Sequence, residues 1–184
     1  TISREFGSGG HTVGKKVAER LGIPCYDNEL IQKIAEQSGF VEEYIKEEGE
    51  HVPQSSWLAS AFTGWNWNGP SNQDLLWTIQ RNIILELAEK ESCVIVGRCA
   101  DFILRDKNCL RVFIHASMEK RAVRIVNEYG ERREAPEQRL KSKDKRRASY
   151  YRFYTDMKWG QSQNYHIALD SGELGLDKCA DIIC

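Results

Sequence analysis

The feature that most constrains this chain is a glycine-rich turn near its start, Gly7-Ser8-Gly9-Gly10. A short apolar segment ending at Arg4 precedes the turn, and a helical pattern follows it. Glycine has no Cβ, so its backbone can adopt positive φ angles and turn several N–H groups toward one point, where a helix N-terminus adds a positive partial charge. A strand, a glycine turn and a helix in this order predict a phosphate-binding cradle.

The segment after the turn has the period of a helix that packs against a sheet. Its apolar residues recur on one face, at Val13, Val17, Ala18 and Leu21. Residues 22–24, Gly-Ile-Pro, end this helix, and residues 25–27 predict a short second strand. A strand, a helix and a second strand are typical of parallel α/β proteins.

The rest of the chain repeats this alternation. Strands are predicted for residues 92–96, 110–115 and 164–169, and helices for residues 74–90, 117–126 and 174–183. We therefore expect residues 1–184 to form a single three-layer α/β domain, a parallel sheet of about five strands with helices on both faces.

The charges of the chain are balanced overall but unevenly placed. The formal net charge of −1 gives no general attraction to nucleic acid or to a membrane surface. Residues 40–53 are acidic, and residues 132–152 are basic. Because the basic run lies between predicted elements of the fold, it does not resemble a nucleic-acid-binding tail. We expect neither nucleic acid nor a membrane among the partners.

The cysteines and the apolar segments bear on the compartment. Six cysteines are scattered without C-x-x-C spacing, which predicts reduced thiols. No stretch approaches the roughly 20 apolar residues of a membrane span, and no signal-peptide pattern is visible. We therefore expect a cytoplasmic protein.

The glycine loop departs from the common phosphate-binding pattern G-x-x-x-x-G-K-[ST]. That pattern almost fits residues 9–15, but Lys16 stands where a hydroxyl should be. A second register over residues 7–22, Gly-Ser-Gly-x-x-Thr-Val-x-Lys-x-x-Ala-Glu-x-Leu-Gly, resembles the P-loop and first helix of nucleoside monophosphate kinases. In that register Gly10 stands at the phosphate-binding lysine, and His11 stands at the magnesium-binding hydroxyl.

Residues 2–10, Ile-Ser-Arg-Glu-Phe-Gly-Ser-Gly-Gly, resemble specifically the cytidylate kinase-like family, in which the lysine-free loop is itself the motif. The resemblance extends over residues 2–183, except for residues 40–72. It implies a P-loop kinase fold and transfer of a phosphoryl group from ATP, with Mg²⁺, to a nucleoside monophosphate such as CMP or dCMP. It leaves the metal ligands open. ATP would bind at Gly7, Ser8, Gly9, Gly10, His11 and Thr12.

A cation near the loop could replace the missing lysine. Arg4 lies at the entry of the loop and Lys15 one turn inside the helix, so either could reach the β- or γ-phosphate, an arginine as a bidentate donor. Without such compensation the chain would be a nucleotide-binding sensor without turnover. A kinase of another small metabolite is the third alternative, because folds of this kind serve several acceptors.

The acceptor site is expected at the carboxyl ends of two strands. Arg98 follows the strand at residues 92–96 in a Gly-Arg pair that resembles the acceptor-phosphate arginine of these kinases; the alternative is a surface arginine paired with Asp101. Asp27 resembles the aspartate near the acceptor nucleotide, and the alternative is a helix cap. Arg81, on the preceding helix, could face the same crevice.

Residues 130–160 correspond to the lid of the nucleoside monophosphate kinases, whose arginines close over the phosphates. The lid pattern Arg-x-x-x-Asp-x-x-Arg is matched in its second half by Asp144 and Arg147. Its first arginine falls on Leu140, and Arg139 or Lys141 could substitute for it. Asp144 and Arg147 therefore join the predicted catalytic residues. Arg121 and Arg124, on the helix before the lid, are expected to point outward or toward the lid hinge.

Residues 40–72 occupy the position of the acceptor-binding insertion. Three tryptophans lie there among Ser, Asn and Gly, at Trp57, Trp65 and Trp67. Such aromatic residues could stack on a base, pin the insertion to the core, or form the interface of a homodimer.

Overall fold

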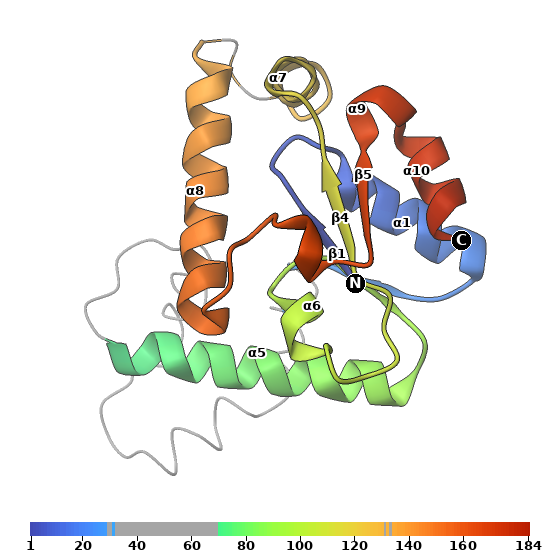
Figure 1. The fold of residues 1–184 in the computed structure, drawn as a ribbon, viewed down its shortest axis with the longest axis vertical. Coiled ribbons are helices and arrows are strands. Elements are labelled where there is room, and N and C mark those ends of the chain that lie inside the picture. The colour runs from blue at the N-terminus through green and yellow to red at the C-terminus, as the bar shows by residue number, and fades with distance from the viewer. Residues whose placement is uncertain (29–30, 32–69, 131, 133) are drawn as a thin grey trace. The chain divides into compact units, whose positions relative to one another are not determined.

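The computed structural model describes residues 1–28, 31, 70–130, 132 and 134–184 (Figure 1). The chain divides into two units, which are described separately: residues 1–26 with 92–184, and residues 27–91. The tryptophan-rich segment and the greater part of the predicted acceptor-binding insertion lie outside the described residues. In the described part of the chain, no helix is both long enough and apolar enough to cross a bilayer.

The larger unit contains a parallel sheet in two pieces. Strand β1 (Ile2–Arg4) pairs with β4 (Val112–His115), which pairs with β5 (Ile167–Asp170). Strand β2 (Cys25–Tyr26) pairs with β3 (Val94–Ile95). A parallel bridge between Ile2 and Val96 joins the two pieces, and the Gly97 amide donates a 2.9 Å hydrogen bond to the Ile2 carbonyl. The five strands therefore follow the order β2-β3-β1-β4-β5, and all their pairings are parallel, which confirms the predicted parallel sheet of about five strands.

This order places β1 in the middle of the sheet. The chain crosses from β1 to β2 on one side of it, and β4 and β5 lie on the other side. In open parallel sheets, ligands bind outside the carboxyl ends of the strands where the strand order changes direction. The glycine loop leaves the carboxyl end of β1 and therefore lies at this point.

Helices cover both faces of the sheet in this unit. On one face, α1 (Gly10–Leu21) and α10 (Leu176–Ile183) lie side by side, and their inner residues share a core with β1, β3 and β4 (Figure 1). That core includes Ile2, Val13, Val17, Val112 and Cys179. Leu21, predicted to join the apolar stripe of α1, is half exposed because it lies in the last turn.

The opposite face carries α6 (Ala100–Ile103) and α8 (Pro136–Thr155). Successive side chains of a strand point to opposite faces, so Ser3 points away from the Ile2 core. The Ser3 hydroxyl donates to Asp101 of α6, and the Tyr151 hydroxyl of α8 donates to the same carboxylate. The predicted three-layer arrangement is thus confirmed in this unit.

Three more helices and one short turn complete the described residues. In the larger unit, α7 (Met118–Asn127) follows β4, a 3-10 turn (Ser162–Asn164) precedes β5, and α9 (Ser171–Leu174) follows it. In the smaller unit, α5 (Pro70–Lys90) extends the helix predicted over residues 74–90 by one turn, and its Ile79, Ile83 and Ile84 are buried.

Candidate functional site

The glycine loop forms the floor of a cavity of about 260 Å³, here called the loop cavity. Gly7 and Gly9 both adopt φ +77°, and Gly9 is the N-cap of α1. A Cβ on Gly7 would lie 2.8 Å from Cγ2 of Ile125, so this glycine is required by space as well as by conformation. The loop cavity is lined by Arg4, Glu5, Phe6, Gly7, Gly9, Gly10, His11, Thr12, Tyr129 and Arg147.

Arg4 lies across the loop at the position where the sequence lacks a lysine. A Cβ on Gly10 would lie 2.5 Å from Cβ of Arg4 and within 3.3 Å of its Cγ and Cδ. The other end of the side chain reaches Gly97, because a Cβ there would lie 2.4 Å from Nη1 of Arg4. The arginine therefore runs from the glycine loop to the end of β3, and both glycines leave room for it.

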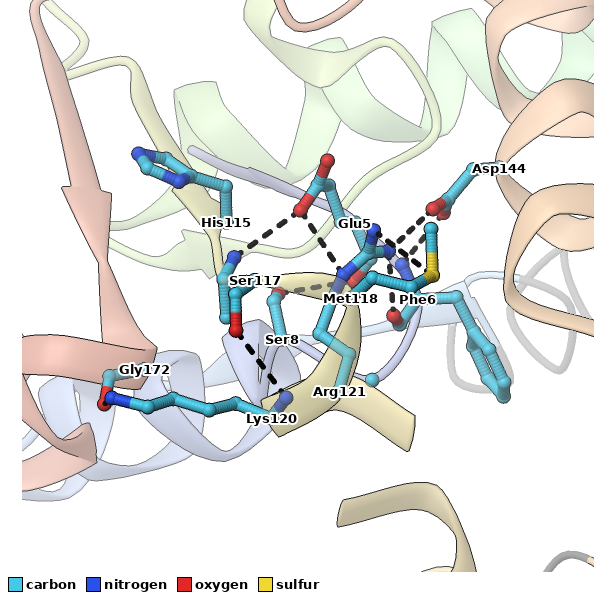
Figure 2. Close-up of polar contacts among 12 residues, drawn as sticks. Glu5, Phe6, Ser8, His115, Ser117, Met118, Lys120, Arg121, Asp144 and Gly172 are labelled. Carbon is cyan, nitrogen blue, oxygen red and sulfur yellow. Dashed lines mark hydrogen bonds and ion pairs between the residues drawn. The ribbon is translucent and has the colours of Figure 1, made fainter. Parts of the chain in front are cut away.

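Below the loop, Arg121 of α7 joins two carboxylates and the loop backbone (Figure 2). Its Nη1 lies 2.5 Å from Oδ2 of Asp144 and donates to the Phe6 carbonyl at 3.2 Å. Its Nε lies 3.4 Å from Oε2 of Glu5. The Phe6 amide donates to Oδ1 of Asp144 at 2.8 Å. We call Glu5, Arg121 and Asp144 the Arg121 cluster.

Burial shapes the electrostatics around this cluster. The Arg121 side chain is 6% exposed. Burial raises the pKa of Glu5, and the Arg121 charge opposes this shift, as does a hydrogen bond from the Ala116 amide to the Glu5 carboxylate. Burial lowers the pKa of Arg147, against the attraction of Asp144. The positive charges of the arginines and the negative charges of the carboxylates thus stabilise one another beneath the loop.

Arg147, a predicted catalytic residue on α8, lines the loop cavity with Arg4. Its Nη1 donates to the Arg4 carbonyl at 3.2 Å and lies 3.8 Å from Oδ1 of Asp144. Its guanidinium also lies 5.5 Å from the centre of the Phe6 ring, within the range of a cation–π contact. The structure therefore brings Arg4, Arg147 and the glycine loop together.

Arg98 lies in a strained turn after β3. Gly97, Arg98 and Cys99 have φ +83°, +55° and +54°, and left-handed backbone costs a non-glycine residue about 1 kcal/mol or more. The Arg98 guanidinium lies 5.9 Å from the centre of the Tyr150 ring. The carboxylate of Asp101 is buried and accepts hydrogen bonds from Ser3 and Tyr151 instead, which gives no support to the alternative of an Arg98–Asp101 pair.

Four of the remaining predicted residues lie elsewhere. Lys15 is exposed on α1 and does not line the loop cavity. Ser8, within the loop, is buried and does not line the loop cavity, and its hydroxyl donates to the Glu5 carbonyl. Asp27 and Arg81 belong to the smaller unit, where Asp27 is half buried and Arg81 is exposed.

The predicted alternative that Arg121 and Arg124 point outward is wrong, whereas Arg121 does reach the lid segment, where it pairs with Asp144 of α8. Arg121 is buried in its cluster, and Nη1 of Arg124 donates to the Gly7 carbonyl at 3.0 Å. Residues 121, 124 and 125 share one face of α7, and the contact of the buried Ile125 with Gly7 shows that this face points to the loop. The apolar side chain of Val123, on the opposite side of α7, is 60% exposed.

Helix α8 is attached to the loop at several points. Leu140 is fully buried, and its Cδ2 lies 3.2 Å from where a Cβ on Gly7 would be. The Asp144 carboxylate accepts a hydrogen bond from the Phe6 amide, and the Tyr151 hydroxyl donates one to Asp101. The side chains of Leu140, Asp144 and Arg147 thus form one wall beside the glycine loop.

Comparison with known proteins finds a matching family model and similar structures. The model of the cytidylate kinase-like family matches residues 1–173. An uncharacterized protein from Eubacterium ventriosum is 33% identical, with a TM-score of 0.74 over 99% of this chain and 92% of that one. No curated protein matches the chain.

Two more distant structures show the fold alone. Shikimate kinase from Acinetobacter baumannii, in complex with shikimate, is 18% identical, with a TM-score of 0.52 over 99% of this chain and 88% of that one. TT1252 from Thermus thermophilus is 14% identical, with a TM-score of 0.60 over 99% of this chain and 93% of that one.

Proposed function

The chain belongs to the cytidylate kinase-like family, and on that premise we propose that it transfers the γ-phosphoryl group of ATP to a nucleoside monophosphate, with CMP and dCMP as the first candidates. The observation that carries the proposal is the loop cavity, in which Arg4 and Arg147 face a glycine loop at a helix N-terminus. Such a site suits a polyphosphate.

The chemistry requires little covalent participation by the protein. Phosphoryl transfer depends on positioning and on neutralising the charge of the transferring group. The loop amides would bind the β- and γ-phosphates. Arg4 would contact these phosphates in place of the missing lysine, and Arg147 would approach them from α8. Lys15, exposed on α1, is the weaker candidate for replacing the lysine.

The acceptor would be held by residues near the carboxyl ends of β2 and β3. Arg98 stands in a strained turn directly after β3, and strained backbone is found disproportionately at functional sites. We assign Arg98 to the acceptor phosphate. That Asp27 and Arg81 contact the acceptor stays a prediction from the family resemblance. Asp144, engaged by Arg121 and the Phe6 amide, acts by positioning the loop.

Magnesium is expected to enter with ATP. This ion usually keeps several waters and takes only one or two protein oxygens beside the phosphates, where it neutralises charge on the β- and γ-oxygens. Thr12 lines the loop cavity next to His11 and can supply a hydroxyl oxygen of this kind. Among the described residues, no group of three His, Cys, Asp or Glu side chains could hold a metal by itself.

Two alternative functions each have a specific observation in their favour. Gly10 stands where P-loop kinases have their phosphate-binding lysine, and this favours a nucleotide-binding sensor that does not turn ATP over. The shared fold of shikimate kinases keeps a kinase of another small metabolite open, because one fold serves many acceptors.

Coupled measurement of ADP release tests the proposal. ATP and Mg²⁺ are supplied with CMP, dCMP, UMP, AMP, GMP or shikimate, and a reaction without acceptor is the control. Turnover with CMP or dCMP above the control supports the proposed function. ATP binding without acceptor-dependent ADP release supports the sensor, and turnover with shikimate alone supports the metabolite kinase.

A further inference from the structure

We propose that Arg121 is a positioning residue which, through Glu5 and Asp144, sets the backbone of the glycine loop in the form that accepts a polyphosphate. The inference deepens the proposed function, since it concerns how the same loop binds ATP when Gly10 replaces the lysine. Arg121 itself lies below the loop and does not line the loop cavity.

The contacts of Arg121 fix the peptide units on both sides of Phe6. The Phe6 amide donates to one oxygen of Asp144, and the Phe6 carbonyl accepts from the guanidinium that binds the other oxygen. With both its donor and its acceptor held, Phe6 cannot rotate its peptide planes without breaking a hydrogen bond to a charged group. The next carbonyl, of Gly7, is held by Arg124.

The orientation of these peptides decides where the loop amides point. Gly7 has positive φ and little intrinsic preference for one backbone conformation, so the direction of the following amides depends on external contacts. In a lysine-containing loop, the lysine charge also draws the phosphates in. Here the cation is Arg4, which lies outside the loop and extends toward Gly97, so we assign a larger share of phosphate affinity to the preset backbone.

Burial makes the cluster hard to replace. Arg121 is 6% exposed and Asp144 is 17% exposed, and the three charged groups come from the residue after β1, from α7 and from α8. Removing one member of a buried ion pair leaves its partner charged without compensation. The cluster therefore ties the conformation of the loop to the docking of α7 and α8.

Binding of ATP with Mg²⁺, and separately of tripolyphosphate, is measured by calorimetry without any acceptor. Tripolyphosphate has no base or sugar and reports on the loop alone. We expect Arg121→Met to raise the dissociation constant of both ligands at least about tenfold, as expected for lost hydrogen bonds to charged groups. Arg121→Lys keeps the charge but not the two-sided geometry, and we expect an intermediate constant.

Two further variants separate positioning from folding. Asp144→Asn keeps an oxygen for the Phe6 amide and removes the ion pair, so it tests the inference even if Arg121→Met does not fold; we expect a several-fold weaker affinity. Arg105→Met is the matched control, because Arg105 is exposed and its guanidinium lies over Phe102. This control should bind both ligands as the wild type does.

The inference is overturned if the folded Arg121→Met or Asp144→Asn protein binds tripolyphosphate with the wild-type constant. A lower melting temperature with unchanged affinity would make the cluster structural only, and also overturns it. Because no acceptor is present, a wild type that binds ATP but transfers no phosphoryl group refutes the proposed function and leaves this result intact. A wild type that binds neither ligand refutes both.

Discussion

The Arg4 side chain lies directly against the backbone of Gly10, so that a Cβ on Gly10 would stand 2.5 Å from the Arg4 Cβ. The side chain of Arg4 therefore occupies the space that a side chain at position 10 would need. A larger residue at position 10 has no room while Arg4 is present, and the long side chain of Arg4 supplies the cation at this end of the loop.

Gly10→Ala should therefore destabilise the protein by about 1 to 3 kcal/mol, the usual cost of forcing an extra carbon into a packed site. It should also weaken ATP binding, because Arg4 must move. The double change Arg4→Gly with Gly10→Lys removes the clash and restores the common lysine, and it should bind ATP better than Gly10→Ala. Thermal unfolding and calorimetry measure both effects; equal affinity of Gly10→Ala and wild type would contradict the arrangement.

Leu140 offers a test of how α8 is attached. Leu140→Ala should cost about 2 to 5 kcal/mol of unfolding free energy, because this side chain is fully buried. Leu140→Arg completes the lid pattern of the nucleoside monophosphate kinases but buries an unpaired charge, so it should destabilise the protein further. Urea unfolding measures both, and Leu110→Ala at a 42% exposed site is the control. A stable Leu140→Arg protein would mean that α8 can leave the loop.

The buried carboxyl of Asp101 predicts a pH dependence of stability. Burial raises its pKa above the ordinary 3.8, although Tyr151 and Ser3 donate hydrogen bonds to it. The folded state then holds this proton to higher pH than the unfolded chain does, so the contribution of Asp101 to stability falls as pH rises from about 4 through the raised pKa. Burial of Glu5 acts in the same direction.

Asp101→Asn should consequently make the unfolding free energy fall less steeply with pH. Urea unfolding at several values between about pH 4 and 7 gives the slope. Asp106→Asn, at a side chain that is 86% exposed, serves as the matched control and should keep the wild-type slope. An unchanged slope in Asp101→Asn would show that this carboxyl titrates alike in both states.

Much of the fold could be predicted from local patterns. The glycine loop, the helix after it and the short β-branched strands have periods and turn residues that depend on neighbours in sequence. The position of Arg98 followed from its place after a strand, since parallel strands present their carboxyl ends at one edge.

The charged residues below the loop could not be predicted in this way. A polar side chain on a helix is assigned to solvent by pattern, and Arg121 is buried only because Glu5 and Asp144 meet it from elements distant in sequence. Likewise, the position of Arg4 depends on Gly97, which follows β3 and is distant in sequence. The spacing of Arg121, Arg124 and Ile125 on one face was the available signal.

We propose that Arg4 replaces the loop lysine, and steady-state ADP release tests this role most directly. With ATP, Mg²⁺ and the best acceptor, kcat/KM is compared among wild type, Arg4→Ala and Lys15→Ala. We predict that Arg4→Ala lowers kcat/KM at least about 100-fold, as loss of one charge-stabilising donor does, and that Lys15→Ala has a much smaller effect. A folded Arg4→Ala enzyme with wild-type kcat/KM would contradict the account.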